Sequence, residues 1–304
     1  MKNSGISILS DNGMVRGYFL NSKELVQKAF EYHHTAPVVT AALGRLLTAA
    51  AMMGRTLKND SDLLTLQIDC GGPIKSVLAT GDRNSKVKGY AGNPIVDIPL
   101  NKVGKLDVSG ALGPGFLTVL RDNGEGEPYV SQTMLVSGEI AEDITHYYAT
   151  SEQTPTVCAL GVLVDRDYSV KSAGGFLLQL LPGADEETIS ILEENIQKVQ
   201  NVSSLFEHTS NEAIADILMD RIPYHINETW NGEYYCNCSK EKTEKVLLSL
   251  GKKTLAELIE EDKPVELCCH FCDQRYSFDV EEMKDLLIQG LVEISGRLPR
   301  WRKW

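Results

Sequence analysis

Five of the seven cysteines of this 304-residue chain lie in its last quarter. They are Cys236, Cys238, Cys268, Cys269 and Cys272. Cys70 and Cys158 stand alone among apolar residues, and we interpret them as small buried hydrophobic side chains. The clustered cysteines belong to a short unit, residues 232–290, and a unit of this size rarely has enough core to fold unaided. It needs a covalent or metal staple.

The spacing of the clustered cysteines is typical of a zinc site. Zn²⁺ prefers four tetrahedral soft ligands, and two thiolates one or two residues apart supply two of them from one turn. Cys236 and Cys238 form one such pair, and Cys269 and Cys272 form the other. In a reducing compartment this pattern favours zinc over a structural disulfide. The predicted metal ligands are therefore these four cysteines.

Other interpretations of the same residues stay open. Cys269-x-x-Cys272 also matches a thioredoxin-like redox pair, although no strand–helix context of that kind surrounds it. Cys268 could replace Cys269 as a ligand, but its spacing to Cys272 is one residue longer, and we treat it as a bystander thiol. His270 lies between two predicted ligands and could compete for the metal, although four thiolates already fill the coordination sphere.

The Cys-x-Cys pair adds the possibility of a switch. A disulfide across one intervening residue closes a small, strained ring, and strained disulfides are the reducible, regulatory kind. Metal-bound thiolates are also deprotonated, which is the form that oxidants attack. Because structural zinc contributes on the order of 10–16 kcal/mol to the folding of small domains, oxidation of the ligands should unfold the unit.

Charge and hydropathy exclude several classes of protein. The formal net charge of −12 argues against binding to a nucleic-acid backbone, which needs clustered Lys and Arg. Residues 1–10 lack the basic start and apolar run of a secretory signal. Residues 36–54 are long and apolar enough to imitate a membrane span, but Arg45 at their centre is costly in a bilayer, so we expect a buried core helix. We expect a cytoplasmic protein without a membrane or nucleic-acid partner.

The pattern along the chain predicts an α+β fold in four parts. Residues 1–183 form a mixed sheet-and-helix core domain, because many strand signals with few helices do not suit a doubly wound sheet. Residues 184–231 form a helical linker, residues 232–290 the zinc-binding unit, and residues 291–304 a basic tail to which we assign no role.

Turn and cap signals place several elements. Asn12-Gly13 predicts a hairpin between residues 6–10 and 14–20, and residues 129–136 are expected to return beside residues 116–120. In the linker, acidic residues 185–187 begin one helix. Thr209 and Glu212 form a capping box that begins a second. The first linker helix carries a narrow apolar stripe, which consists of Ile189, Leu192, Ile196 and Val199.

The chain also resembles the redox-regulated heat-shock chaperones, or 33 kDa chaperonin family, over about residues 3–288. The most specific motif is Cys236-x-Cys238 followed by Cys269-x-x-Cys272. Further stretches that look like the family are Ala41-Ala42-Leu43-Gly44-Arg45, Gly71-Gly72-Pro73-Ile74, Gly104-Lys105-Leu106-Asp107-Val108, Ser151-Glu152-Gln153-Thr154-Pro155 and Ala173-Gly174-Gly175-Phe176. Cys268 and the tail depart from the family pattern.

The resemblance implies an ATP-independent holdase. The reduced, zinc-bound protein would be inactive. Oxidation would join Cys236 to Cys238 and Cys269 to Cys272 and release zinc, after which the zinc unit and linker would unfold. The active form would be a homodimer that holds unfolding client proteins and prevents their aggregation.

Rival functions come from two other classes. A constitutive zinc-stapled module that binds RNA or protein has the same cysteine spacing. However, residues 233–285 contain eight Lys/Arg and thirteen Asp/Glu, a balance of −5 that does not suit phosphate binding. A thiol oxidoreductase would require turnover through Cys269 and Cys272. No other arrangement in the sequence indicates catalysis, and we expect no enzyme.

Overall fold

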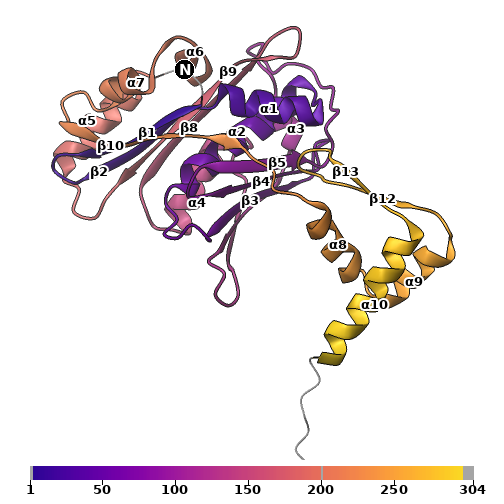
Figure 1. Cartoon of the computed structure of the whole chain (residues 1–304). Coiled ribbons are helices and arrows are strands. Elements are labelled where there is room, and N and C mark those ends of the chain that lie inside the picture. Colours follow the sequence, from indigo (N-terminus) through magenta and orange to yellow (C-terminus); the bar gives the residue numbers. More distant parts are fainter. Residues whose placement is uncertain (1–2, 200, 297–304) are drawn as a thin grey trace, which may run out of the picture. The chain divides into compact units, whose positions relative to one another are not determined.

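The computed structural model describes residues 3–199 and 201–296. The chain divides into two compact units, residues 1–235 and residues 236–304, hereafter the N-terminal and C-terminal units. Mixed sheets and segregated helices confirm the predicted α+β class (Figure 1).

Two sheets build the N-terminal unit. The strand order of the first sheet is β10-β1-β2-β9-β8, and that of the second is β11-β5-β4-β3-β6-β7. The first sheet consists of β1 (Ser4–Ser10), β2 (Val15–Asn21), β8 (Thr156–Val164), β9 (Val170–Leu180) and β10 (Tyr224–Asn231). The second sheet consists of β3 (Leu63–Cys70), β4 (Ser76–Asp82), β5 (Lys86–Ala91), β6 (Gly115–Asp122), β7 (Tyr129–Met134) and β11 (Glu233–Tyr234).

Both predicted hairpins are present. β1 and β2 pair antiparallel, with Gly13 in the turn at a φ of 71°, a conformation that glycine adopts without strain. β6 and β7 pair in the same way, with Phe116 opposite Met134. Successive side chains of a strand point to opposite faces of its sheet. One face can therefore be buried in a core, while the other faces solvent or helices.

Helix α2 (Pro37–Gly54) is the centre of the main core. It packs against β3, β4 and β5 of the second sheet and against β8 and β9 of the first. Its apolar window is long enough to cross a membrane, but 89% of that window is buried inside the protein, which makes it a core helix. A Cβ at Gly44 would lie 2.6 Å from Val26 Cγ1, so close helix packing requires glycine there. The remaining helices on this core are α1 (Lys23–His33), α3 (Val108–Leu112) and α4 (Ala141–Thr150).

Three short helices cover the first sheet and form a second core. They are α5 (Glu186–Ile196), α6 (Val202–His208) and α7 (Asn211–Leu218). Leu192, Phe206 and Ile214 pack with Phe19 and Phe176 of the sheet, and all five are at most 4% exposed. Because isolated helices of this length are marginal, their stability comes from this docking.

The structure corrects the linker in three details. Ser210, not Thr209, caps α7, since Ser210 Oγ accepts from the Ala213 N–H at 3.2 Å. Helix α6 has no cap or periodic signal in the sequence and was not predicted. Residues 224–231 form strand β10, which pairs antiparallel with β1, and so are not helical. The four-part division of the chain stays a prediction.

The C-terminal unit is small. It contains α8 (Lys240–Ser249), α9 (Lys252–Glu260), the antiparallel pair β12 (Val265–Cys268) and β13 (Arg275–Phe278), and α10 (Val280–Gly296). Its buried core consists of Leu247, Leu255, Phe278, Met283 and Leu286. Helix α10 ends at Gly296, so it extends into the predicted basic tail, residues 291–304. Residues 297–304 of that tail lie outside the described residues.

Candidate metal centre

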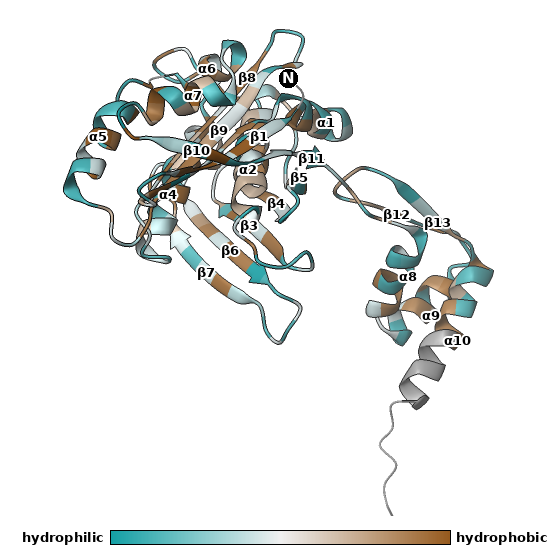
Figure 2. Cartoon of the chain, turned by 60° about the vertical axis from the view of Figure 1, so that its left-hand side comes forward, coloured by the Kyte–Doolittle hydropathy of each residue, from teal (hydrophilic) through white to brown (hydrophobic). Residues whose placement is uncertain are grey.

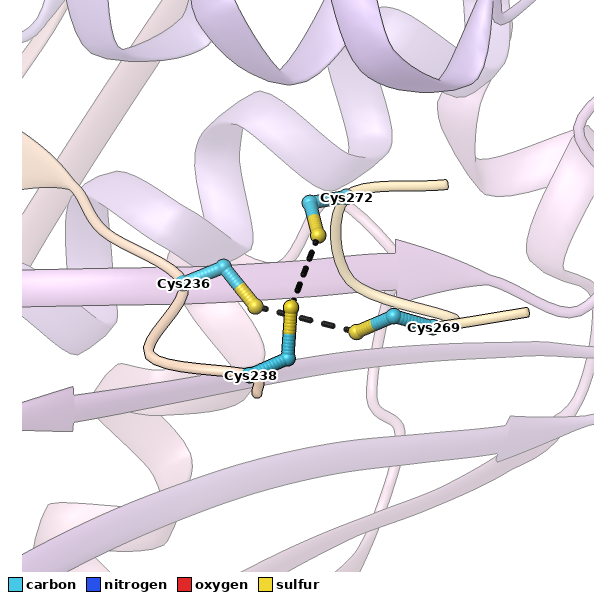
Figure 3. Close-up of side chains that lie close together, drawn as sticks. All are labelled: Cys236, Cys238, Cys269 and Cys272. Atoms are coloured by element: carbon cyan, nitrogen blue, oxygen red, sulfur yellow. Dashed lines mark hydrogen bonds between the residues drawn. The ribbon is translucent and has the colours of Figure 1, made fainter. Parts of the chain in front are cut away.

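Two turns of the C-terminal unit bring four cysteines together (Figure 3). Cys236 and Cys238 precede α8, whereas Cys269 and Cys272 lie in the turn between β12 and β13. The Sγ atoms of Cys236 and Cys269 are 3.7 Å apart, and those of Cys238 and Cys272 are 3.4 Å apart. All four Sγ atoms lie within 4.8 Å of one another.

Local backbone structure explains why the second turn presents both of its sulfurs. The ladder of β12 and β13 continues into the turn, where the Cys269 N–H donates to the Gln274 carbonyl at 2.9 Å. The N–H groups of Cys272 and Asp273 both return to the Cys269 carbonyl. Asp273 takes a left-handed conformation, with a φ of 58°, that closes the turn. The first pair is followed directly by Ser239, whose Oγ caps α8.

The spacing of the sulfurs fits a tetrahedral thiolate site. A Zn–S bond of 2.3 Å in tetrahedral geometry places sulfurs about 3.8 Å apart, close to the 3.4 and 3.7 Å found here. The chemistry of the donor set is also suitable, because thiolates are soft ligands that select zinc and other thiophilic metals. The four-cysteine cluster can therefore bind a metal ion.

Without a metal, the pKa values of three of the thiols are shifted in different directions. Burial raises the pKa of the Cys236 thiol and that of Cys272. Burial also acts to raise the pKa of Cys238, but hydrogen bonds from the Tyr276 hydroxyl and the neighbouring thiols outweigh it, so that pKa lies below its usual range. A divalent cation held by these four sulfurs would supply the charge that keeps them deprotonated.

Tyr276 is a site residue that sequence reasoning missed. Its hydroxyl donates to Cys238 Sγ at 3.1 Å, and this bond raises the pKa of the Tyr276 phenol. The sequence indicates this role only in part. Tyr276 lies four positions after Cys272, but its hydroxyl contacts a cysteine on the other turn. Groups that hydrogen-bond metal ligands orient them and tune their basicity.

The two alternative ligands lie outside the cluster. Cys268 is exposed, and its Sγ donates to Asp273 Oδ1 at 3.4 Å. Partial desolvation and this hydrogen bond raise the pKa of the Cys268 thiol. Neither Cys268 nor His270 belongs to the group of side chains that can share one metal ion among the described residues. Cys158 is buried and Cys70 half-buried in the main core, away from any such group.

Comparison with known proteins decides the family. A sequence model described as "Hsp33 protein" matches residues 4–279. The chain belongs to the Hsp33 family. It is 48% identical over 288 residues to the 33 kDa chaperonin of Lachnoclostridium phytofermentans, covering 92% of this chain and 96% of that relative. It is 46% identical over 289 residues to the 33 kDa chaperonin of Clostridioides difficile, covering 94% and 99%.

The fold of a solved Hsp33 structure agrees with this assignment. The 33 kDa chaperonin of Thermotoga maritima superposes with a TM-score of 0.89 at 36% identity, covering 96% of this chain and all of that chain. Hsp33 proteins are redox-regulated holdases, chaperones that bind unfolded client proteins and are not enzymes. The predicted function and the absence of an enzymatic role are thus confirmed at the level of the family, with a cysteine cluster suited to such a switch.

Proposed function

We infer that Cys236, Cys238, Cys269 and Cys272 bind one Zn²⁺ in the reduced protein, and that loss of this site activates the holdase. The observation that carries the proposal is the convergence of four Sγ atoms within 4.8 Å from two turns that are distant in sequence. The bound ion would hold both turns together and keep the thiols deprotonated.

The C-terminal core is so small that the unit needs the bound ion to stay folded. Only five apolar side chains of the described unit are fully buried, and α8 and α9 are ten and nine residues long. Helices of that length are marginal alone, and a core of this size does not offset the conformational entropy of the unit. Residues 232–290 therefore act as the redox-switch domain.

Oxidation removes the four ligands in two steps, and each step takes two electrons from one pair of cysteines. Cys236 and Cys238, held as thiolates, form one disulfide and lose two electrons, while one hydrogen peroxide takes up these electrons and two protons from solvent and becomes two waters. Cys269 and Cys272 do the same with a second peroxide. Although the closest sulfurs in the folded unit belong to opposite turns, only cysteines of the same turn stay close once the unit unfolds, because short loops close at the least entropic cost.

Release of helices α5–α7 from the first sheet then exposes the client-binding surface. The second core lies between the first sheet and helices α5–α7, and Figure 2 shows the hydrophobic bands on these elements. Undocking the three helices uncovers Phe19, Phe176 and Leu178 on the sheet and the apolar faces of the helices. Apolar surface of this extent binds unfolded proteins and drives self-association, which supports a homodimeric active form.

The thiol chemistry also favours the cytoplasm. A site that depends on four reduced cysteines persists only where the thiol pool is reducing, and oxidative stress is then the signal that alters it. The rival RNA-binding module gains no support, since residues 233–285 carry a net charge of −5.

One assay tests the proposal. Aggregation of a thermally unfolding client is followed by light scattering with reduced protein and with protein treated with peroxide at elevated temperature, while zinc release is measured on the same sample. We expect no protection from the reduced form, strong protection from the oxidised form, and one zinc released per chain. Peptide mapping should find Cys236–Cys238 and Cys269–Cys272 disulfides. Equal protection by both forms would reject the switch.

A further inference from the structure

A groove of about 730 Å³ lies within the N-terminal unit. It is lined by strand β8, by the first half of α2, by the loop before α3 and by the first turn of α6. From β8 it takes residues 160–164, and from the loop it takes Leu100, Lys105 and Leu106. Its strand residues Leu160 and Val162 belong to the main core, whereas its lining residue Val202 on α6 packs against the second core.

The strand in this groove has an unpaired edge. β8 is the outermost strand of the first sheet. The Leu180 N–H donates to the Pro155 carbonyl at 3.0 Å, whereas the Cys158 N–H points away from β9 and donates to Thr145 Oγ1 at 3.1 Å. Directions alternate along an antiparallel strand, so the N–H and C=O groups of Leu160 and Val162 also point away from β9.

Those main-chain groups are available for a partner. Among the described residues, the outward N–H groups of Leu160 and Val162 have no hydrogen-bond acceptor. As whole residues Leu160 and Val162 are only 7% exposed, and their side chains pack into the main core, so a partner strand reaches their main chain once the groove has widened. An unpaired strand edge of this kind is a template for another extended chain.

The rim of the groove is cationic on a protein of net charge −12. Lys105 and Arg166 are exposed lining residues, and Asp165 is the acidic one. Arg45 also lines the groove, but its Nη1 is paired with Glu139 Oε2 at 2.6 Å. Lys105 and Arg166 therefore complement acidic side chains of a bound segment.

We propose that this groove binds an extended, acidic segment of an unfolded client as an added strand on β8. The proposal rests on the holdase function, because unfolded clients supply extended main chain with unpaired donors and acceptors. Strand addition takes its affinity from main-chain hydrogen bonds and thus tolerates many sequences. Lys105 and Arg166 give the preference for acidic segments.

Helix α6 links the groove to the redox state. A Cβ at Gly161 would lie 2.4 Å from the Ser203 nitrogen, so the first turn of α6 closes tightly on β8. Lys105 Nζ donates to Asn201 Oδ1 at 2.8 Å, and Ser172 Oγ donates to the Ser203 carbonyl at 2.8 Å. Release of α5–α7 on oxidation breaks these contacts, which frees Lys105 and widens the groove.

The test uses the full-length oxidised protein and a fluorescein-labelled unstructured peptide made of Val, Thr and Glu. A matched peptide carries Lys in place of Glu. Lys105→Glu/Arg166→Glu reverses both rim charges. The control, Lys102→Glu/Lys23→Glu, changes the net charge equally at exposed lysines that do not line the groove. Binding is measured by fluorescence anisotropy, and amide exchange is measured at residues 160 and 162. Client aggregation is followed in parallel.

The expected result has three parts. The acidic peptide slows exchange at residues 160 and 162 about tenfold. The rim reversal weakens its binding about tenfold and the control does not. The Lys peptide binds the rim-reversed protein better than the parent. If oxidised protein suppresses aggregation but exchange at residues 160 and 162 is unchanged by the peptide, the groove assignment is overturned and the holdase function stands. If oxidised protein does not suppress aggregation, the holdase function fails and the groove assignment fails with it.

Discussion

The hydroxyl of Tyr276 donates a hydrogen bond to Cys238 Sγ at 3.1 Å, although 38 positions separate the two residues. The bond joins strand β13 to the cysteine turn before α8 and withdraws charge from one sulfur of the cluster. It is therefore in a position to set both how tightly the cluster binds a metal and how readily Cys238 reacts with an oxidant.

Loss of the bond raises the pKa of the Cys238 thiol, so protons compete more strongly with zinc, and we expect Tyr276→Phe to weaken zinc binding about tenfold. Without the donated bond the sulfur is more electron-rich, so zinc release under peroxide should also be faster. Chelator competition and the rate of zinc release measure the two effects. Tyr235→Phe is the matched control, since it removes an exposed phenol whose hydroxyl makes no hydrogen bond to a cluster cysteine among the described residues. Unchanged affinity in Tyr276→Phe would show that the bond has no role.

Substitution of Cys268 and of Cys269 tests which of these two neighbouring cysteines is the metal ligand. We expect Cys268→Ser to retain one zinc per chain, because its exposed Sγ bonds to Asp273 and lies outside the cluster. Cys269→Ser should lose the zinc and the helical signal of the C-terminal unit, because three thiols remain. Metal analysis and circular dichroism provide the readouts. The reverse pattern would make Cys268 the ligand in place of Cys269.

The docking of α5 should control basal activity. Leu192 is 4% exposed in the second core. Leu192→Asn is expected to cost about 2–4 kcal/mol of docking free energy, and the reduced variant should then protect clients from aggregation. Ile196, which packs partly buried beside it, should give a weaker effect of the same sign. Ile217→Asn is the control at a position 37% exposed. If reduced Leu192→Asn does not protect clients from aggregation, release of α5–α7 is not the activating step.

Acid should loosen α5 through its cap. Asp185 accepts a hydrogen bond from the Thr188 N–H at 2.8 Å, and this bond lowers the pKa of the Asp185 carboxyl. A lowered folded-state pKa means that the charged cap stabilises the fold above the unfolded pKa of ~3.9. That stabilisation is lost as the pH falls through the folded-state pKa. Asparagine caps a helix without titrating, so Asp185→Asn should show a shallower loss of stability in acid.

The measurement for this prediction is the urea midpoint between pH ~5 and pH ~3. Fluorescence of the buried Trp230 reports unfolding in a Trp301→Phe/Trp304→Phe background. The urea midpoints of the parent and of Asp185→Asn should converge as the pH falls and Asp185 becomes protonated. Parallel curves for the parent and Asp185→Asn would assign no pH-dependent role to the cap.

The sequence was most informative where local chemistry alone fixes structure. Asn12-Gly13 predicts its hairpin because few residues tolerate the turn, and Cys236-x-Cys238 with Cys269-x-x-Cys272 predicts a shared site because thiolates at that spacing suit one ion. The length and apolarity of residues 37–54 suit a membrane span as well as a core, but Arg45 at their centre favours a core helix, and the sheets packed on both sides confirm it.

Features that depend on tertiary partners were not accessible from one sequence. β10 is exposed along most of its length and lacks an alternating apolar pattern, so nothing local marks it as a strand until β1 pairs with it. Helix α6 has no side-chain cap and buries only Phe206, which docks between elements distant in sequence. Tyr276 escaped notice for the same reason, because its partner lies on the other cysteine turn.

The central claim is that a metal ion held by four sulfurs keeps the C-terminal unit folded. Residue-level amide exchange of β12, β13 and α9 tests it directly in reduced zinc-loaded, reduced chelated and peroxide-oxidised protein. We expect protection of these amides only in the zinc-loaded sample, with the sheets of the N-terminal unit protected in all three. Full protection of β12, β13 and α9 in the chelated sample would contradict the claim.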